Sequence, residues 1–572
     1  MRRLLLATTS ILALSIAVDA HAADLPAPYA PWSWTGFYVG AHVGGAWGST
    51  NFSDPFGGSI FGDHVHTPGF LGGGQIGYNW QAPGTSWVVG LEADASALDS
   101  DGTSTCFASS AITVNTTCRV RPDATATFAA RFGFAVGPAG RTLIYGKGGL
   151  AWAHDTIDMA LNAGGNPTFS TSSSQTVNLW GEVAGVGIEH ALTPAWSVKL
   201  EYDYLNFGNT NVANLGSVSF VPTTPHFIVG TSPPGTSNVS QTIQQLKLGL
   251  NYKFGADPRA QGWNDPAYAT KAVPLVSAWE FEAGGRYVGS WGRFQKDIGM
   301  FKSAGFSSIS DVSRLTYSDM QTNAGEFFGR VDTPWNLFVK GYVGGGGIRS
   351  GHMNDEDFVL PFGTLLAAYS NTLTPTVNGD TFYGVIDAGF DVLRGPGYKA
   401  GVFGGYFAMN ENMKGFGCSA IAFINCTPPI PASGSAIITE SDRWRAARVG
   451  VSAETMLTDR IKVSGDIAYL PWVSFNGTDH HFFGNTGILA EEFPASGNGR
   501  GVQLDALISY YLTPQWSIGL GGRYWGLRTS SGQFNANILG GVPVPPTPPQ
   551  FFKAQVEQAG AFVQTSYRFG SP

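Results

Sequence analysis

The sequence predicts an all-β fold made of two tandem transmembrane antiparallel β-barrels, the first with eight strands and the second with ten. A closing-strand pattern, an alternating segment ended by an aromatic-basic-aromatic triplet, occurs at 248–255 and again at 565–570. Aromatic residues make up 13% of the chain, charged residues only 13%, and glycines number 77. A soluble domain carries about twice that charge, whereas alternating lipid-facing and lumen-facing residues produce this balance.

Residues 1–22 are typical of a cleaved secretory signal. They contain two arginines, an apolar stretch from Leu4 to Val18, and the small-x-small site Ala20-His21-Ala22. The apolar stretch is shorter than the roughly 20 residues that a membrane-spanning helix needs, which argues against an anchor. We therefore expect residues 1–22 to be a signal peptide, so that the first barrel occupies residues 23–255.

Segments of period-2 alternation predict eight strands in the first half of the chain. The connections between them alternate between about twenty or more residues and only a few, as expected for an outer-membrane barrel with long outer loops and short inner turns. The strands are expected at 36–47, 70–80, 86–95, 124–136, 142–153, 178–191, 195–205 and 242–254.

The first of these strands opens with Trp34-Thr35-Gly36-Phe37-Tyr38-Val39-Gly40-Ala41, and the last ends with Tyr252-Lys253-Phe254-Gly255. Together these motifs resemble the small eight-stranded surface-antigen barrels of α-proteobacteria, which are related to the OmpA-type transmembrane domain. The resemblance covers about 34–255. It implies a fold and a bacterial outer-membrane location, but no activity.

Residues 256–276 lack periodicity and contain three prolines, as in a linker. A second barrel is expected over 277–572. A single merged barrel of eighteen strands, a porin, is the rival architecture, but the internal closing pattern and the linker favour two barrels. The ten strands are expected at 278–290, 312–322, 335–346, 380–391, 397–409, 436–453, 460–474, 500–512, 515–527 and 555–569.

The four cysteines form two local pairs, each inside one segment between expected strands. Cys106 lies near Cys118, and Cys418 lies near Cys426. In an oxidising compartment this spacing predicts two disulfides rather than a metal site, because no tight Cys-x-x-Cys pair is present. Asp63-His64-Val65-His66 has metal-like spacing but lacks a second cluster, so we expect an exposed loop there. We expect no metal and no cofactor.

Two clusters in the second half could carry chemistry, since each lies where a strand enters a long outer loop. Asp355 and Asp357 point to one side if the strand geometry persists, and so do Asp479 and His481. Their strands, the third and seventh of ten, lie nearly opposite each other. A histidine held by a carboxylate can take a proton from water while the facing acids position that water, which suits hydrolysis.

The same segments resemble a known family. Asn354-Asp355-Glu356-Asp357 is similar to the Asp-x-Asp segment of the omptins, ten-stranded outer-membrane proteases, and Asp479-His480-His481 is similar to their Asp-x-His segment. The resemblance covers about 277–569. It implies an aspartic-type endopeptidase with Asp355 and Asp357 as the aspartate pair and Asp479 and His481 as the dyad. It also implies a peptide or protein substrate at the cell surface and a requirement for lipopolysaccharide.

The sequence departs from the omptin pattern at the substrate pocket. Omptins favour basic residues through two pocket acids, but Gly477 stands in place of one, and 291–294 offers no carboxylate for the other. The leading hypothesis is nonetheless a surface endopeptidase among outer-membrane lipid and lipopolysaccharide. The alternatives are a non-catalytic structural or adhesive surface protein, or a porin if the halves merge. The net charge of -8 argues against a nucleic-acid partner.

Overall fold

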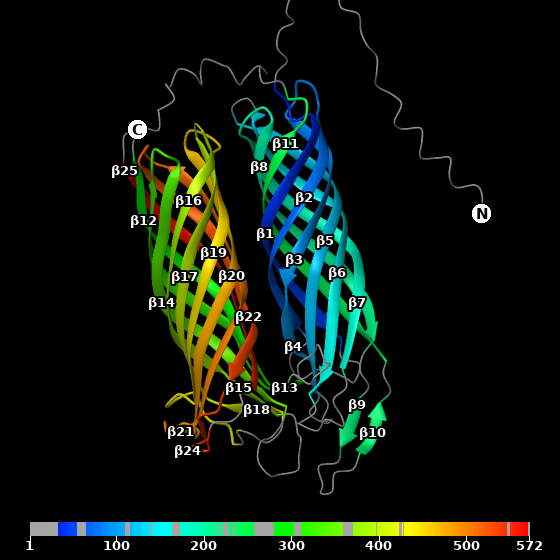
Figure 1. Cartoon of the computed structure of the whole chain (residues 1–572), viewed down its shortest axis with the longest axis vertical. Coiled ribbons are helices and arrows are strands. Elements are labelled where there is room, and N and C mark those ends of the chain that lie inside the picture. Colours follow the sequence, from blue (N-terminus) through cyan, green and yellow to red (C-terminus); the bar gives the residue numbers. More distant parts are fainter. Residues whose placement is uncertain are drawn as a thin grey trace, which may run out of the picture.

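The computed structural model contains two closed β-barrels that lie side by side (Figure 1). The expected signal segment 1–22 and nearly all of the expected linker lie outside the described residues. Within the described part of the chain, no helix is long and apolar enough to cross a membrane. The structure describes residues 32–53, 64–108, 115–137, 140–162, 172–213, 217–220, 228–232, 235–256, 279–301, 310–358, 370–395, 397–422, 426, 428–545 and 550–569.

The first barrel is a ring of long antiparallel strands, in which each strand pairs with both neighbours and the first pairs with the last. Glycines alternate with β-branched or aromatic residues along these strands. The glycines leave room in the lumen for the larger side chains of neighbouring strands. In order around the ring, the described strands are β1 (Gly36–Phe52), β2 (His64–Gln81), β3 (Trp87–Ser100), β5 (Asn115–Val136), β6 (Thr142–Leu161), β7 (Ser172–Ala191), β8 (Trp196–Ala213) and β11 (Thr236–Lys253).

The second barrel is a separate ring, closed between β13 and β14 as well as between β12 and β25. It is larger, and a continuous set of buried aromatic and aliphatic side chains fills its lumen. In order around the ring, the described strands are β12 (Glu280–Phe301), β13 (Ser310–Asp332), β14 (Leu337–Asp357), β16 (Thr376–Gly395), β17 (Tyr398–Phe416), β19 (Ile438–Met456), β20 (Ile461–Phe482), β21 (Leu489–Tyr511), β22 (Trp516–Phe534) and β25 (Gln550–Phe569).

The strand counts of eight and ten are confirmed within the described residues, and each falls in the half of the chain that the periodicity indicated. Two separate rings exclude the merged eighteen-stranded barrel, because no strand of one ring completes the other. Most strands extend at their outer ends into segments expected to be loops. The short strands, which lie at those outer ends, are β4 (Gly102–Ala108), β9 (Ser217–Phe220), β10 (Ile228–Ser232), β15 (Ser370–Thr374), β18 (Ser419–Ala422), β23 (Ile538–Leu539) and β24 (Val542–Pro543).

Both expected disulfides are present, Cys106–Cys118 and Cys418–Cys426. The first joins β4 to the outer end of β5. These two strands form a hairpin beyond the closed ring, which we call the β4–β5 hairpin.

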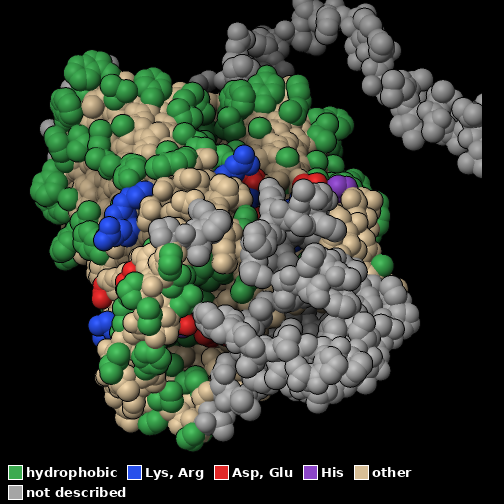
Figure 2. All heavy atoms as spheres, turned by 60° about the horizontal axis from the view of Figure 1, so that its bottom comes forward, with side chains coloured by type: hydrophobic (Ala, Val, Ile, Leu, Met, Phe, Trp, Pro, Cys, Tyr) green, Lys and Arg blue, Asp and Glu red, His purple; other side chains and the backbone are tan. Residues whose placement is uncertain are grey.

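Outward-facing aromatic residues mark a hydrophobic belt around the barrels. On β12, Phe281, Tyr287 and Trp291 are all exposed, and ten residues separate the first from the last. In a tilted strand that distance matches the roughly 25 Å apolar band of outer-membrane barrels. Figure 2, which brings the outer end forward, shows hydrophobic side chains over the walls behind it. On β20 the last exposed aromatic residue is Trp472, so the outer ends of these strands lie beyond the belt.

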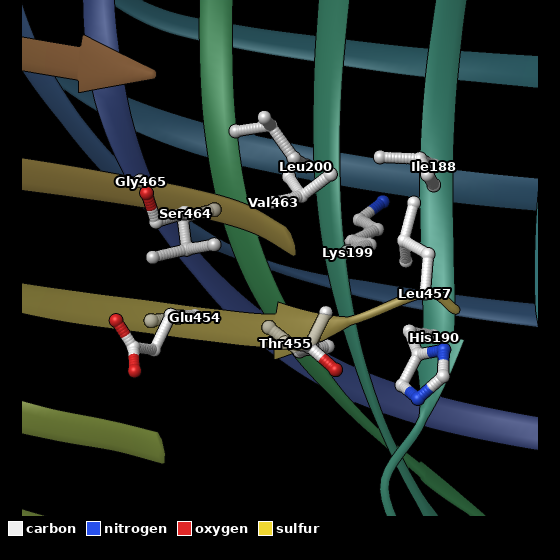
Figure 3. A pocket seen from close by; sticks show the side chains of 13 residues that line it. Ile188, His190, Lys199, Leu200, Glu454, Thr455, Leu457, Val463, Ser464 and Gly465 are labelled. Carbon is white, nitrogen blue, oxygen red and sulfur yellow. The ribbon is translucent and has the colours of Figure 1, made fainter. Parts of the chain in front are cut away.

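The barrels touch through β1 and β2 of the first and β20, β21 and β22 of the second, and β4 contacts β12, β13 and β14. Trp47 stacks on Tyr524 with ring centroids 4.9 Å apart. Near the inner turns, a small apolar crevice separates Ile188 and Leu200 from Val463 (Figure 3). Outward-facing residues of the two barrels therefore pack directly against each other at Trp47 and Tyr524, and they leave a small gap near the inner turns.

Candidate active site

The aspartate pair lies on β14, near its outer end. Met353 is buried in the lumen of the second barrel, and because side chains alternate along a strand, Asp355 and Asp357 face the lumen as well. Both carboxyls are partly exposed, whereas Glu356 between them points outward and is completely buried. The expectation that strand geometry persists this far is confirmed, because β14 ends at Asp357 and not before it.

The dyad lies on β20, seven and nine residues beyond Trp472. The Nε2 atom of His481 lies 3.0 Å from Oδ2 of Asp479. Asp479 is completely buried, while the His481 side chain is 22% exposed. A buried carboxylate therefore orients an imidazole that still reaches the open end of the barrel. The neighbouring His480 faces the other way and approaches Glu492 at 3.4 Å.

The charges of the pair and of the dyad influence each other. Burial raises the pKa of Asp355 to about 8, and the nearby Asp357 adds to that rise. Burial likewise raises the pKa of Asp357 to about 6, against the opposing effect of His481. The effect of His481 on both carboxyls couples the aspartate pair electrostatically to the dyad.

The dyad itself is strongly polarised. Burial alone would lower the pKa of His481, but Asp479 outweighs this effect and raises that pKa to about 10. Burial opposes ionisation of Asp479, yet Lys296 and His481 together hold the pKa of this carboxyl well below its usual range. An imidazolium paired with a carboxylate is therefore the resting form of the dyad at neutral pH.

Lys296, which the sequence reading missed, is part of the site. It projects from β12 into the lumen, and its Nζ lies 3.2 Å from Oδ2 of Asp479 and also pairs with Glu440 of β19. The alternation of side chains along this strand places Phe294 and Lys296 on the lumen side. A buried charge there needs a partner, so this pattern is the signal in the sequence that could have identified Lys296.

Glu491 is the second residue that the sequence reading missed. It stands opposite His481 in the β20–β21 register, and its Oε2 lies 3.6 Å from Nδ1 of His481. The imidazole thus has a carboxylate on each ring nitrogen. Only the pairing of β20 with β21 reveals this contact, and no spacing within the sequence indicates it.

The absence of a side chain at Gly477 has a structural counterpart on the adjacent strand. A Cβ built at Gly477 would lie 2.3 Å from Oδ1 of Asp442. Asp442 and Glu440 therefore place acidic groups beside the dyad from β19, where the sequence reading found none. Burial and the neighbouring Glu440, to which Asp442 is hydrogen-bonded, raise the pKa of Asp442 well above its usual range, which favours the neutral form of this carboxyl.

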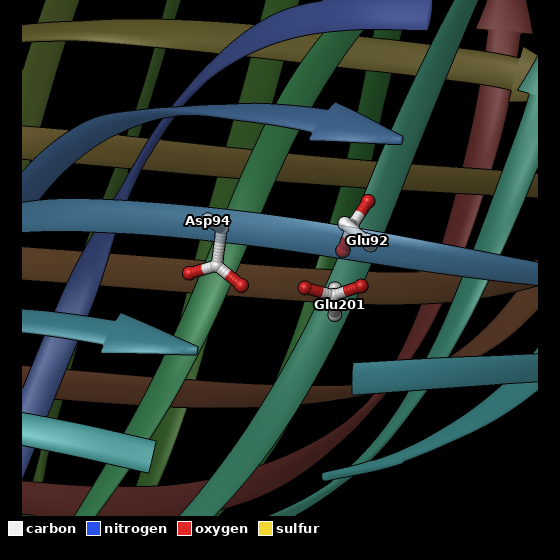
Figure 4. Close-up of side chains that lie close together, drawn as sticks. All are labelled: Glu92, Asp94 and Glu201. Carbon is white, nitrogen blue, oxygen red and sulfur yellow. The ribbon is translucent and has the colours of Figure 1, made fainter. Parts of the chain in front are cut away.

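The first barrel holds a different acidic cluster that the sequence reading did not identify. Carboxylate oxygens of Glu92, Asp94 and Glu201 lie within 4.8 Å of one another, and the three side chains face one another in the lumen (Figure 4). Lysine ammonium groups already lie between them, for example Lys147 at 3.0 Å from Glu201 and 3.1 Å from Asp94. Ammonium groups thus take the positions that a metal ion would need.

The segment expected to be an exposed loop at Asp63-His64-Val65-His66 requires correction. His64 and His66 belong to β2, because the strand extends beyond the predicted 70–80 and pairs with β1 over its full length. His66 lines a cleft of about 700 Å³ between the barrels, together with Trp47 and Trp291. Asp63 lies outside the described residues.

Comparison with known proteins identifies the family of the first barrel. A family model described as outer membrane protein beta-barrel domain matches residues 10–254. The 31 kDa outer-membrane immunogenic protein of Brucella melitensis is 30% identical over 255 residues, which cover 43% of this chain and 94% of that protein. The protein of the same name from Brucella suis matches equally. The chain belongs to this family of outer-membrane β-barrel proteins. It is a protein of the bacterial outer membrane.

Two solved structures align with parts of the chain. The outer membrane protease OmpT from Escherichia coli aligns at 14% identity with a TM-score of 0.42, covering 51% of this chain and 97% of that chain. The attachment invasion locus protein Ail of Yersinia pestis aligns at 11% identity with a TM-score of 0.18, covering 38% of this chain and 99% of that chain. Neither similarity is close enough to bear on activity.

Proposed function

We propose that the second barrel is a surface endopeptidase of the omptin type, in which Asp355, Asp357, Asp479 and His481 hydrolyse peptide bonds. The observation that carries the proposal is a hydrogen-bonded histidine–carboxylate dyad electrostatically coupled to a carboxyl pair at one barrel mouth. Titratable groups that are perturbed by burial and by a specific partner, and that lie in an accessible hollow, are typical of catalytic sites.

The protonation states of Asp355, Asp357 and His481 indicate the role of each group in the proposed reaction. At neutral pH Asp355 holds a proton, Asp357 is mostly ionised and His481 is an imidazolium. Asp357 then accepts the proton of the attacking water, and Asp355 donates a hydrogen bond to the peptide carbonyl. The imidazolium of His481 protonates the leaving amine. This differs from the expectation that His481 takes the proton from water, because Asp479 and Glu491 hold the imidazole in its charged form.

The charged groups beside the dyad bear on the specificity of the proposed site. Lys296 introduces a positive charge, and its ion-pair partners Glu440 and Asp479 supply the opposing acidic groups. The predicted loss of acidity at Gly477 is therefore offset from the neighbouring strand. We propose that the substrate is a peptide or protein at the cell surface, and that the charge of its side chain beside these groups influences the rate of cleavage.

The experiment is digestion of a broad peptide library by refolded full-length protein in detergent, with and without lipopolysaccharide, which we propose as an activator and lipid partner. Asp355→Ala, Asp357→Ala, Asp479→Ala and His481→Ala should each abolish cleavage, while heat-modifiable migration of the folded barrel remains. Complete inertness of the wild-type protein with lipopolysaccharide present would favour a non-catalytic adhesive or structural surface protein instead.

A further inference from the structure

The β4–β5 hairpin of the first barrel lies against the outer wall of the candidate active site. Along β12, β13 and β14, side chains alternate between the lumen and the outer surface. Lys296 and Asp355 face the lumen, whereas the outward residues beside them meet the hairpin. Those outward residues are Asp297, Asp311, Arg314 and Glu356, all buried.

Thr105 of β4 makes the most direct contact. Its Oγ1 donates a hydrogen bond to Oε2 of Glu356 over 3.1 Å and accepts one from Nη1 of Arg314. Glu356 stands between Asp355 and Asp357, so the contact acts on the backbone that carries the aspartate pair. Since neighbouring residues on a strand share that backbone, a shift of Glu356 moves both carboxyls.

Arg314 extends the contact to β12. Its Nε donates to Oδ1 of Asp297 over 2.7 Å, and its Nη2 donates to Oδ2 of Asp311 over 2.6 Å and to Oγ1 of Thr117 over 3.3 Å. Asp297 also accepts a hydrogen bond from Thr103 of β4 and directly follows Lys296. The hairpin therefore contacts two strands that carry residues of the site.

The hairpin is itself held in a single arrangement. Thr105 pairs with Thr117 in the strand register, and the disulfide Cys106–Cys118 joins the adjacent residues. Hydrogen bonds to charged groups are the strong ones in proteins. A buried group that loses its partner pays the full desolvation penalty, so a fully buried network of this kind favours one geometry.

We propose that the β4–β5 hairpin is a positioning element for the candidate active site, and that the first barrel thereby holds the aspartate pair at its working distance from the dyad. Thr105 is a positioning residue that acts through Glu356 and touches no substrate. The catalytic part of this inference rests on the proposed endopeptidase function, whereas the geometric part does not. The first barrel is then more than an independent surface module fused to an enzyme.

The test compares three variants of the full-length protein, refolded in detergent. Thr105→Val keeps the shape of the side chain but removes the hydroxyl, and Thr105→Ser restores it. Tyr469→Phe is the matched control, because it removes another hydrogen bond between the barrels, from Tyr469 to Asp99 over 3.0 Å, away from β12, β13 and β14. If Thr105→Val does not fold, Thr117→Val removes a contact in the same network.

Two readouts separate positioning from mere stability. The first is cleavage, for which Thr105→Val should lower kcat by about tenfold with KM nearly unchanged, since displacing a catalytic group by less than 1 Å has effects of this order. Thr105→Ser should recover most of the loss, and Tyr469→Phe should match the wild type.

The second readout is the NMR titration of the His481 imidazole, assigned with His481→Ala, which requires no cleavage. Asp355, Asp479 and Glu491 all face this ring, so retreat of the aspartate pair should move its titration to lower pH in Thr105→Val. A folded Thr105→Val protein with the kcat and the His481 titration of the wild type overturns the proposal. A wild-type protein that cleaves nothing overturns the proposed function, while the titration still decides whether the hairpin positions the pair.

Discussion

The two barrels handle buried charge in opposite ways. In the lumen of the first, every acid of the central cluster has a lysine or arginine within reach. Lys247, for example, lies 2.9 Å from Asp94 and 2.6 Å from Asp203. The cationic members of this network are Arg131, Lys147, Lys199 and Lys247, and the acidic members are Glu92, Asp94, Glu189, Glu201 and Asp203.

At the outer end of the second barrel, acids outnumber the cations that could neutralise them. One oxygen of Asp479 has no hydrogen-bond partner, and Asp442 and Glu440 have each other as partners, two acids without a cation between them. Buried polar groups are normally satisfied, so each exception needs an explanation. A closed, paired network fixes a structure, whereas an open, acidic one leaves bonding capacity for water or a guest molecule. This contrast is consistent with the proposal that the second barrel carries the active site.

The largest expected effect comes from removing the imidazole of the second barrel. His481→Asn should reduce peptide cleavage by roughly 10²–10⁴-fold, because it removes a general acid or base from the reaction. The matched control is His154→Asn in the first barrel, whose Nδ1 lies 2.6 Å from Asp123. The His154–Asp123 pair resembles the His481–Asp479 dyad in its histidine–carboxylate contact, but it lies in the first barrel, away from Asp355 and Asp357. Its loss should therefore leave the rate of cleavage unchanged. Equal rates for both variants would remove the distinction between the barrels.

Unfolding in guanidinium chloride tests the contrast in charge pairing. Lys247→Met should lower the free energy of unfolding by about 3–5 kcal/mol, since Asp94 and Asp203 would remain as buried charges with fewer partners. Asp442→Asn should change it by less than about 1 kcal/mol, because the raised pKa of Asp442 favours its neutral form and a neutral amide can replace its hydrogen bond to Glu440. A large loss of stability in Asp442→Asn would show that the second network is also closed.

The pH dependence of cleavage tests the roles assigned within the site. Cleavage should rise as Asp357 ionises near pH 6, fall as Asp355 loses its proton near pH 8, and fall further as His481 loses its proton near pH 10. Glu491 stabilises the imidazolium, so Glu491→Gln should lower the pKa of His481 and move the higher of the two alkaline steps to lower pH, while the step of Asp355 stays near pH 8. If His481 were instead the base, the same change would extend activity on the acid side.

The smallest effect should come from the exposed charges between the barrels. Arg500 approaches Asp99 at 3.1 Å, but its side chain is 57% exposed. Arg500→Ala should therefore change the free energy of unfolding by no more than about 1 kcal/mol, as is usual for solvated ion pairs. Arg528→Ala, which removes a buried partner of the same Asp99, should cost more. Equal losses would mean that burial at this seam does not govern stability.

Much of the fold could be predicted because transmembrane strands obey a strict physical rule. Every strand must alternate between lipid and lumen and must pair on both sides, so period-2 segments and their count define the rings. The prediction was weakest at the outer ends. There β2, β14 and β20 continue beyond the apolar belt, and their polar sequences look like loops although their backbones remain paired.

The candidate site could likewise be predicted only in part. Asp355, Asp357, Asp479 and His481 form two local pairs with i, i+2 spacing, which a strand places on one face, so the sequence alone could identify them. Contacts between residues of different strands leave no such pattern in the sequence. Asp442 reaches the space above Gly477 from a neighbouring strand, and no local pattern encodes a contact between residues that far apart in the chain.

The sequence by itself determined the two barrels, their strand numbers, the two disulfides and the local pairs of the site, because all of these depend on alternation or on short spacing. Only the tertiary structure decided that Lys296 and Glu491 flank the dyad, that the first lumen is neutralised, and that the β4–β5 hairpin contacts Glu356 behind the aspartate pair. Those features depend on which strands become neighbours and on how the closed rings face each other, and that arrangement exists only once both barrels have formed.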